Sequence, residues 1–313
     1  MTNPPLAGVF PVLPTPFLAD GSADVDSLRR LVEYLIACGV DGITYPGVAS
    51  EFDMLQEQER LQLTQVVLEA VAGRVPVIAG ATARDVQQAV AFAASAVRHG
   101  AAAVMIAAPA DRSAGEQQGA YFRAIAEQVP RACIMLQNVP GPVGAGLSPE
   151  AIVELVEAVP AIRYVKEETL PSGQRLSTLR AAAPAHLAGV FGGAGGRYIT
   201  DELRRGAAGT MPAIELAEIH VALYRAHRER QDDRVRELFE RMLPVLNIQA
   251  VFRWSLTKYV LHRRGLITDQ RQRAKGPLLD ALDRVEVDTH LSALEGLLLP
   301  RARLDALRAV SHG

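Results

Sequence analysis

The sequence of 313 residues predicts an α/β fold, a (β/α)8 TIM barrel with a C-terminal helical extension, and two observations support that prediction. Short apolar runs recur at intervals of roughly 20 to 35 residues, about the length of one strand with its crossover helix. Each run is mostly continuous rather than alternating, as in strands covered on both faces. Eight strands alternating with helices favour a closed barrel, and an open doubly wound sheet is the alternative.

The eight expected strands can be placed in chain order. They begin at or near Gly8, Gly42, Val75, Ala102, Ala132, Ile162, Leu187 and Gly209. The first helix is expected between Asp24, a suitable N-cap, and Gly39, which suits the residue after a helix end. Further helices, each followed by Gly or Pro, are expected over residues 89–99, 150–159 and 201–205.

The chain shows no strand pattern after the eighth run. Helical periodicity continues instead over residues 216–230, 235–248, 252–264 and 277–285. We therefore predict two domains, a catalytic barrel over residues 1–222 and a helical extension over residues 223–313 that packs on the barrel.

Composition argues against several classes of function. A net charge of −2 gives no electrostatic reason to expect nucleic acid or an anionic membrane as a partner. The N-terminus lacks a signal-peptide pattern, and no apolar run is long enough to span a bilayer. Cys38 and Cys133, on an expected helix and strand, suit buried thiols in a reducing compartment. We therefore expect a cytoplasmic protein.

The end of the sixth expected strand carries the first candidate for chemistry. Lys166 closes an apolar run, and an amine in apolar surroundings loses part of its preference for the charged form and can act as a nucleophile. Because side chains alternate along a strand, Lys166 and Glu168 should share one face while Glu167 points to the other. The alternative is a solvated cluster of charges at a strand end.

Two other strand ends carry small residues that could hold an anion. The second strand ends in a turn that contains Val48, Ala49 and Ser50, whose backbone N–H groups could bind a carboxylate. Glycines that include Gly192 and Gly193 follow the seventh strand and could do the same at a helix start. Either segment could also be an ordinary loop. The histidines lack metal-ligand spacing and no nucleotide fingerprint is present, so we expect no metal and no cofactor.

Taken in order, these strand ends resemble the dihydrodipicolinate synthase / N-acetylneuraminate lyase family of Schiff-base-forming barrels, from about Gly8 to about Leu298. The residues that carry the resemblance are Thr15-Pro16-Phe17, the turn from Gly47 to Glu51, Asn138-Val139-Pro140, Lys166-Glu167 and the glycines after strand seven. The resemblance implies a lyase whose Lys166 forms a Schiff base with a small 2-keto acid. It also implies a homo-oligomer, a tetramer or dimer.

The chain departs from the family pattern in informative places. Gln137 stands where the family usually has a proton-relaying tyrosine, and Val48 and Ala49 stand where it has hydroxyl residues. The arginine of the lysine-biosynthesis synthases falls near Pro142, and the tyrosines expected in residues 108–112 are missing. A true dihydrodipicolinate synthase or sialic acid lyase is therefore not expected.

One branch of the family is closer in its site residues. L-2-keto-3-deoxyarabonate dehydratases resemble this chain at Gln137, at Glu168 and at the Ser50-Glu51 pair. We therefore expect dehydration of a 2-keto-3-deoxy sugar acid through a Lys166 iminium, with Glu168 as the acid/base and Gln137 orienting the substrate or a water. The alternatives are an aldolase that cleaves a 4-hydroxy-2-keto acid to pyruvate and an aldehyde, and a low-activity protein that binds 2-keto acids.

Overall fold

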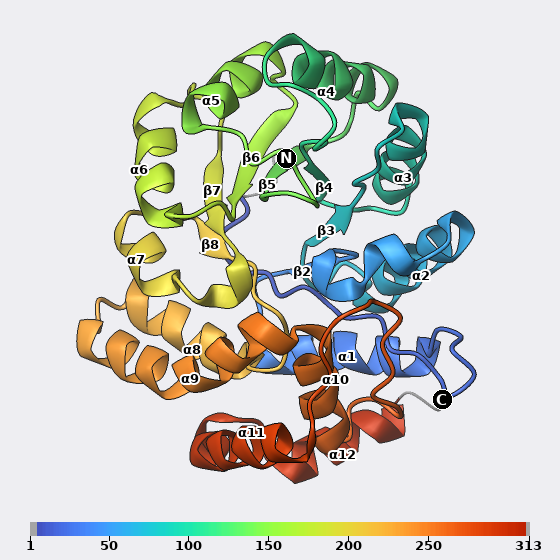
Figure 1. The fold of residues 1–313 in the computed structure, drawn as a ribbon, viewed down its shortest axis with the longest axis vertical. Coiled ribbons are helices and arrows are strands. Elements are labelled where there is room, and N and C mark those ends of the chain that lie inside the picture. The colour runs from blue at the N-terminus through green and yellow to red at the C-terminus, as the bar shows by residue number, and fades with distance from the viewer. Residues whose placement is uncertain (1–4, 311–313) are drawn as a thin grey trace. The chain divides into compact units, whose positions relative to one another are not determined.

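The computed structural model describes residues 5–310, in which eight strands alternate with helices and further helices follow. This is the predicted (β/α)8 barrel with a C-terminal helical extension, and the fold class is confirmed (Figure 1). The chain divides into two compact units. The first comprises the residues up to Gly8, Pro76–Ala194 and Tyr198–Thr210, and the second Val9–Val75, Gly195–Arg197 and the residues from Met211.

The first unit contains most of the sheet. Its strands are β3 (Val77–Gly80), β4 (Ala103–Ala107), β5 (Ile134–Asn138), β6 (Ile162–Glu167), β7 (Gly189–Gly192) and β8 (Gly209–Thr210). They pair in parallel and in sequential order. Almost every strand residue is buried, because helices cover the outer face, as the continuous apolar runs predict (Figure 1). The helices are α3 (Val86–Arg98), α4 (Glu116–Gln128), α5 (Pro149–Ala158), α6 (Ser172–Ala182) and α7 (Ile199–Arg204).

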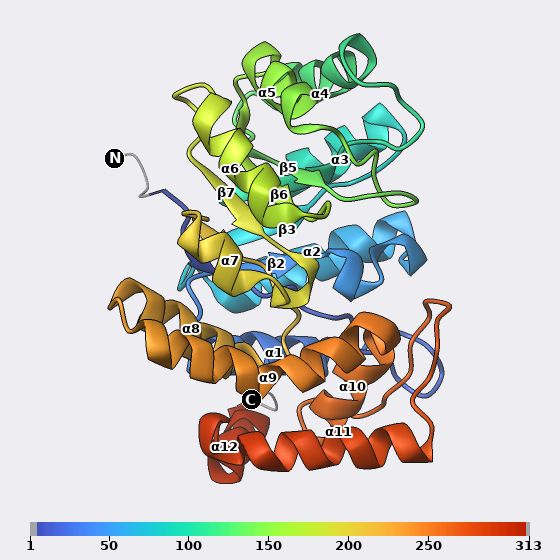
Figure 2. The same cartoon turned by 60° about the vertical axis from the view of Figure 1, so that its left-hand side comes forward.

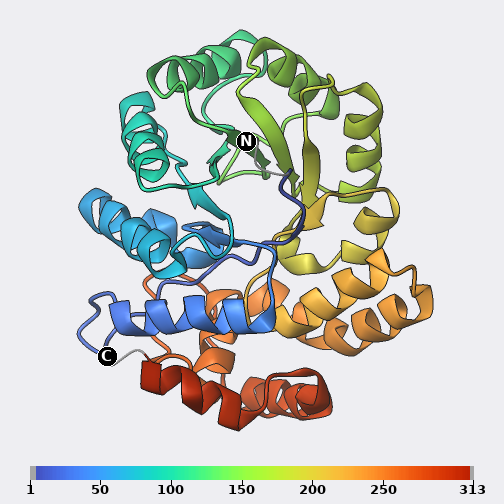
Figure 3. The same cartoon turned by 180° about the vertical axis from the view of Figure 1, so that it is seen from behind.

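The second unit is mainly helical. Strand β1 (Gly8–Val9) lies at the border between the units in the sequence. The second unit contains β2 (Ile43–Tyr45) and the short 3-10 helices Val48–Ser50 and Phe52–Met54. Its helices are α1 (Val25–Cys38), α2 (Glu57–Val71), α8 (Ala217–Arg228), α9 (Asp232–Phe252), α10 (Trp254–Arg263), α11 (Ala281–Leu294) and α12 (Arg301–Val310). Helix α9 packs against α8, α10 and α11 (Figure 2), and α1 packs against α2, α8 and α12 (Figure 3).

Local capping chemistry explains where the helices begin and end. Asp24 accepts a hydrogen bond from the Ser27 N–H at 2.9 Å, and Gly39 takes the left-handed conformation with φ 76°, so the predicted ends of α1 are confirmed. The predicted start of the last helix at residue 277 is wrong. Asp280 accepts from the N–H groups of Leu282 and Asp283, and this cap starts α11 at Ala281.

The two cysteines form no disulfide and are half-buried. Cys133 lies one residue before β5 rather than within a strand, and burial raises the pKa of its thiol. Among the described residues, none of the helices combines the length and the apolar character that crossing a bilayer requires. The border predicted at residue 222 falls within α8, and the division into a barrel and an extension remains a proposal.

Candidate active site

Lys166 and Glu168 meet at the carboxyl end of β6. The Lys166 Nζ lies 3.1 Å from the Glu168 Oε1, and Lys166 is only 4 % exposed. Gln137 stands opposite Lys166 in the β5–β6 register, and its Nε2 donates to the Glu168 Oε2 at 2.8 Å. The alternative of a solvated charge cluster is therefore wrong, because the lysine and both its neighbours on this face are largely shielded from water.

Glu168 is held by backbone as well as side chains. The Ala194 N–H, directly after the glycines of β7, donates to the Glu168 Oε1 at 3.1 Å. A Cβ on Gly193 would collide with the Glu168 carboxylate, so this position requires glycine. Burial alone raises the pKa of Glu168, but the Lys166 ammonium, the Gln137 amide and the Ala194 N–H outweigh it and hold the pKa below 4.5. Glu168 is therefore an ionised carboxylate at neutral pH.

Glu167 points to the other face of β6, as the alternation predicts. Its carboxylate accepts from the Asn138 Nδ2 at 3.0 and 2.9 Å and from the Thr169 N–H at 2.7 Å, and the Arg175 Nε lies 3.3 Å away. Asn138 in turn accepts from the Leu147 N–H at 2.8 Å. This network fixes the ends of β5 and β6, and with them the backbone that carries Gln137 and Lys166.

A further carboxyl group, Glu202 on α7, was not predicted from the sequence. It is 1 % exposed and accepts from the Ser172 hydroxyl at 2.7 Å, while its Oε2 has no partner among the described residues. A Cβ on Gly192 would collide with this carboxyl. Burial, the largest cause, and the charge of Glu168 together raise the pKa of Glu202 to about 7. One feature of the sequence could have indicated that Glu202 is buried: it lies three residues after the apolar Ile199, on the same face of α7.

The predicted carboxylate-binding turn lies in the second unit, as the 3-10 helix Val48–Ser50. The Ser50 hydroxyl donates to the Leu13 carbonyl and accepts from the Gly47 N–H at 2.8 Å. The Ser50 hydroxyl is thus occupied by backbone groups of the protein, and it holds the turn in its conformation. Among the hydrogen bonds of the described residues, the N–H groups of Val48 and Ala49 have no partner, so these backbone donors remain available to an anion.

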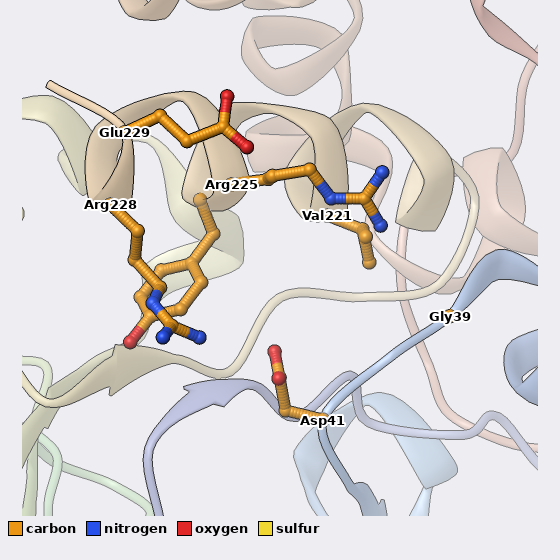
Figure 4. A pocket seen from close by; sticks show the side chains of 7 residues that line it. Gly39, Asp41, Val221, Arg225, Arg228 and Glu229 are labelled. Atoms are coloured by element: carbon orange, nitrogen blue, oxygen red, sulfur yellow. The ribbon is translucent and has the colours of Figure 1, made fainter. Parts of the chain in front are cut away.

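Two other features lie outside this cluster. A surface pocket of about 440 Å³ lies beside α8. Figure 4 shows that its charged side chains are of both signs, Arg225 and Arg228 with Asp41 and Glu229, and it contains none of the predicted site residues. In the described part of the chain, no group of three His, Cys, Asp or Glu side chains could hold a metal ion. His220 is buried, and burial lowers its pKa to about 4.

The chain is similar to known proteins of one family. Residues 5–292 match the model of the dihydrodipicolinate synthetase family. The L-2-keto-3-deoxyarabonate dehydratase of Azospirillum brasilense is 30% identical over 302 residues, 95% of this chain and 97% of that protein. The 4-hydroxy-tetrahydrodipicolinate synthase of Thermosynechococcus vestitus is 37% identical over 177 residues, but the match covers only 56% of this chain and 59% of that synthase.

A solved structure agrees with this placement. The dihydrodipicolinate synthase of Rhodopseudomonas palustris superimposes with a TM-score of 0.86 at 30% identity, over 92% of this chain and 98% of that one. The match spans nearly the whole of both chains.

Proposed function

Because this chain belongs to the dihydrodipicolinate synthetase family, we propose that it is a Schiff-base-forming lyase that dehydrates a 2-keto-3-deoxy sugar acid. The observation that carries the proposal is the shielded cluster of Lys166, Glu168 and Gln137, in which an amine and an ionised carboxylate lie 3.1 Å apart. A nucleophile beside a base is the arrangement that iminium chemistry needs.

The reaction follows from these two groups. Lys166 gives up its ammonium proton to water, and the amine attacks the C2 ketone of the 2-keto acid. The carbinolamine takes a proton back from water and loses its hydroxyl as water, which gives an iminium that withdraws electrons from C3. The Glu168 carboxylate takes a proton from C3, and the electron pair forms an enamine. The enamine expels the C4 hydroxyl, and the protonated Glu168 returns its proton to that leaving group as water. In a five-carbon acid, a proton lost from C5 and one gained at C3 then turn the C5 alcohol into an aldehyde, and hydrolysis of the remaining imine frees Lys166.

Gln137 supports elimination over carbon–carbon cleavage. Aldol cleavage removes the proton of the C4 hydroxyl, and the resemblance implies that relatives route this proton through a tyrosine at the position of Gln137. An amide side chain cannot carry a proton at neutral pH, but it can orient a carboxylate. The 2.8 Å hydrogen bond from Gln137 to Glu168 supports this orienting role. The dehydratase from Azospirillum brasilense supports the same choice.

The remaining roles belong to the same proposal. The N–H groups of Val48 and Ala49, with Ser50 and the Gly192-Gly193 region, hold the substrate carboxylate. Because pyruvate and other 2-keto acids are anionic, such backbone donors suit them. We also propose a cytoplasmic homo-oligomer, a tetramer or dimer, from the family resemblance alone.

Trapping the Schiff base tests the lysine. The chain has three lysines, Lys166, Lys258 and Lys275, so peptide mapping locates an adduct without ambiguity. Reduction with borohydride in the presence of pyruvate should add one pyruvate-derived mass to Lys166. A Lys166→Ala enzyme should give none, and a Lys275→Arg enzyme should react like the wild type. An adduct elsewhere, or no adduct, contradicts the proposed chemistry.

Product analysis tests the reaction type. Supplied with 2-keto-3-deoxy sugar acids of four to six carbons, the enzyme should release the acid that has lost one water, which is a semialdehyde for the five-carbon acid. Release of pyruvate with an aldehyde would support the aldolase. Glu168→Gln should lower the rate of elimination by about 100-fold or more while pyruvate still forms the adduct on Lys166. Undiminished elimination would remove Glu168 from the mechanism. An adduct without turnover of any of these acids would favour the binding protein.

A further inference from the structure

Helix α10, in the C-terminal part of the chain, makes two contacts with the turn that follows β2, residues 48–51, more than two hundred residues earlier in the chain. The Trp254 indole Nε1 donates to the Val48 carbonyl at 2.8 Å. The Lys258 ammonium forms an ion pair with the Glu51 carboxylate, and both side chains are fully buried. Trp254 and Lys258 are four residues apart, so one face of the helix holds both ends of the turn.

The Glu51 carboxylate is satisfied entirely by the C-terminal part of the chain. Its Oε2 accepts from the N–H groups of Arg273 and Ala274, each at 2.6 Å, and its Oε1 accepts from Lys258. Lys258 donates also to the Arg271 carbonyl at 2.6 Å. Glu51 has φ 59°, a conformation that costs a non-glycine residue about 1 kcal/mol, so these contacts maintain a turn that the local sequence disfavours.

The segment that supplies these N–H groups is itself anchored. The Arg273 guanidinium bonds the Glu59 carboxylate on α2 at 2.6 and 2.8 Å. It also lies 4.2 Å from the centre of the Phe17 ring. The segment therefore cannot move away from the turn without breaking several contacts.

Peptide geometry connects this anchoring to the binding of the carboxylate. The Val48 carbonyl and the Ala49 N–H belong to one planar trans peptide, so they point in opposite directions. The hydrogen bond from Trp254, together with one from the Glu51 N–H at 3.1 Å, fixes the Val48 carbonyl and consequently aims the Ala49 N–H away from α10. Within this turn, the Ala49 N–H and the Val48 N–H have no partner among the hydrogen bonds of the described residues.

We propose that α10 and residues 271–274 position the carboxylate-binding turn, with Trp254 and Lys258 as positioning residues that never touch the substrate. The inference rests on the proposed function, because it takes the Val48 and Ala49 N–H groups as the carboxylate site. It assigns the C-terminal extension a part in substrate affinity as well as in stability.

The hydrogen bond of Trp254 can be tested by a matched pair of variants. Trp254→Phe should raise KM for the 2-keto acid, and the half-saturating pyruvate concentration in borohydride trapping, by about tenfold, while kcat stays within twofold. Tyr259→Phe is the control, since it removes a hydrogen bond from the same helix to Asp288 on α11, at 2.9 Å, and should leave both constants unchanged. Circular dichroism and thermal melting check that both variants fold.

Trp254 also provides a direct readout, because it is the single tryptophan of the chain. Its fluorescence should change with pyruvate and saturate at the concentration that half-saturates adduct formation. Two results together overturn this inference alone: KM is unchanged in folded Trp254→Phe, and the fluorescence of the wild type does not change with pyruvate although the adduct forms. Failure of the wild type to form any adduct overturns the proposed function, and the inference with it.

Discussion

At the scale of single residues, the site contains two carboxyl groups in opposite electrostatic conditions. Glu168 lies against the Lys166 ammonium and accepts two further hydrogen bonds, so its pKa is lowered. Glu202 receives one hydrogen bond, from Ser172, and is surrounded by buried atoms and negative charge, so its pKa is raised to about 7. The first is available as a base at neutral pH, while the second is about half protonated there.

Glu202 makes stability depend on pH in a defined direction. A carboxyl group with a pKa of 4.5 in the unfolded chain and about 7 in the folded protein binds more protons when folded between these values. The free energy of unfolding therefore falls as pH rises from about 4.5 to about 7, by about 3 kcal/mol for this group. Urea unfolding at several pH values should show this fall in the wild type.

Glu202→Gln removes the titrating group while keeping an oxygen that can accept from Ser172. Its unfolding free energy should depend less steeply on pH over the same interval, so the variant should gain stability relative to the wild type as pH rises from 5 to 7. Parallel curves for the two proteins would show that Glu202 does not titrate in this range.

At the scale of elements, the site depends on how closely the strand ends approach one another. Strand β7 ends in Gly192, and Gly193 follows it, because larger side chains would occupy the positions of the Glu202 and Glu168 carboxyl groups. Asn138 and Glu167 join the ends of β5 and β6 on the outer face. The inner face is thus left to Gln137, Lys166 and Glu168, the side chains proposed to act.

Gly193→Ala tests this close approach. The added methyl group should displace the Glu168 carboxylate from the Ala194 N–H and lower the rate of elimination by about 100-fold, the scale of a misplaced catalytic group. Adduct formation with pyruvate should persist, because Lys166 is not displaced. Gly296→Ala is the control, since nothing lies within 4 Å of its added Cβ, and it should match the wild type in both assays.

At the scale of the whole molecule, contacts distant in sequence hold the N-terminal turn to the C-terminal helices. Glu51 and Lys258 are separated by 207 residues and have no exposed side-chain surface. A second buried pair, Glu218 with Arg264, joins α8 to the end of α10, and Tyr34 of α1 donates to the Glu218 Oε2 at 2.7 Å. Such pairs specify which segments meet more than they add net stability.

Breaking one buried pair should therefore cost more than replacing it. Glu51→Leu leaves the Lys258 ammonium buried without its carboxylate, and the free energy of unfolding should fall by about 3–5 kcal/mol. The double variant Glu51→Leu/Lys258→Met should recover part of this loss, because no buried charge is then unpaired. Urea unfolding of the wild type, both single variants and the double variant measures the coupling. Additive losses would contradict the interaction of the two side chains.

Much of the fold and the centre of the site could be predicted from the sequence. The eight strands, the two ends of α1 and the pairing of Lys166 with Glu168 on one face all follow from periodicity and capping. These are local properties, since a strand alternates every two residues and a helix is capped by its own neighbours. The start of α11 was misplaced because apolar periodicity continues through residues 277–280, and only the Asp280 cap marks the boundary.

What the sequence by itself determined is the kind of fold and the residues at its strand ends. Only the tertiary structure decided which of them meet: Glu202 lies beside β7, the Ser50 hydroxyl donates to the Leu13 carbonyl, and Glu51 forms an ion pair with Lys258. The physical reason is that these contacts join residues far apart in the chain. Their geometry depends on the packing of whole helices and strands, which no local pattern of side chains records.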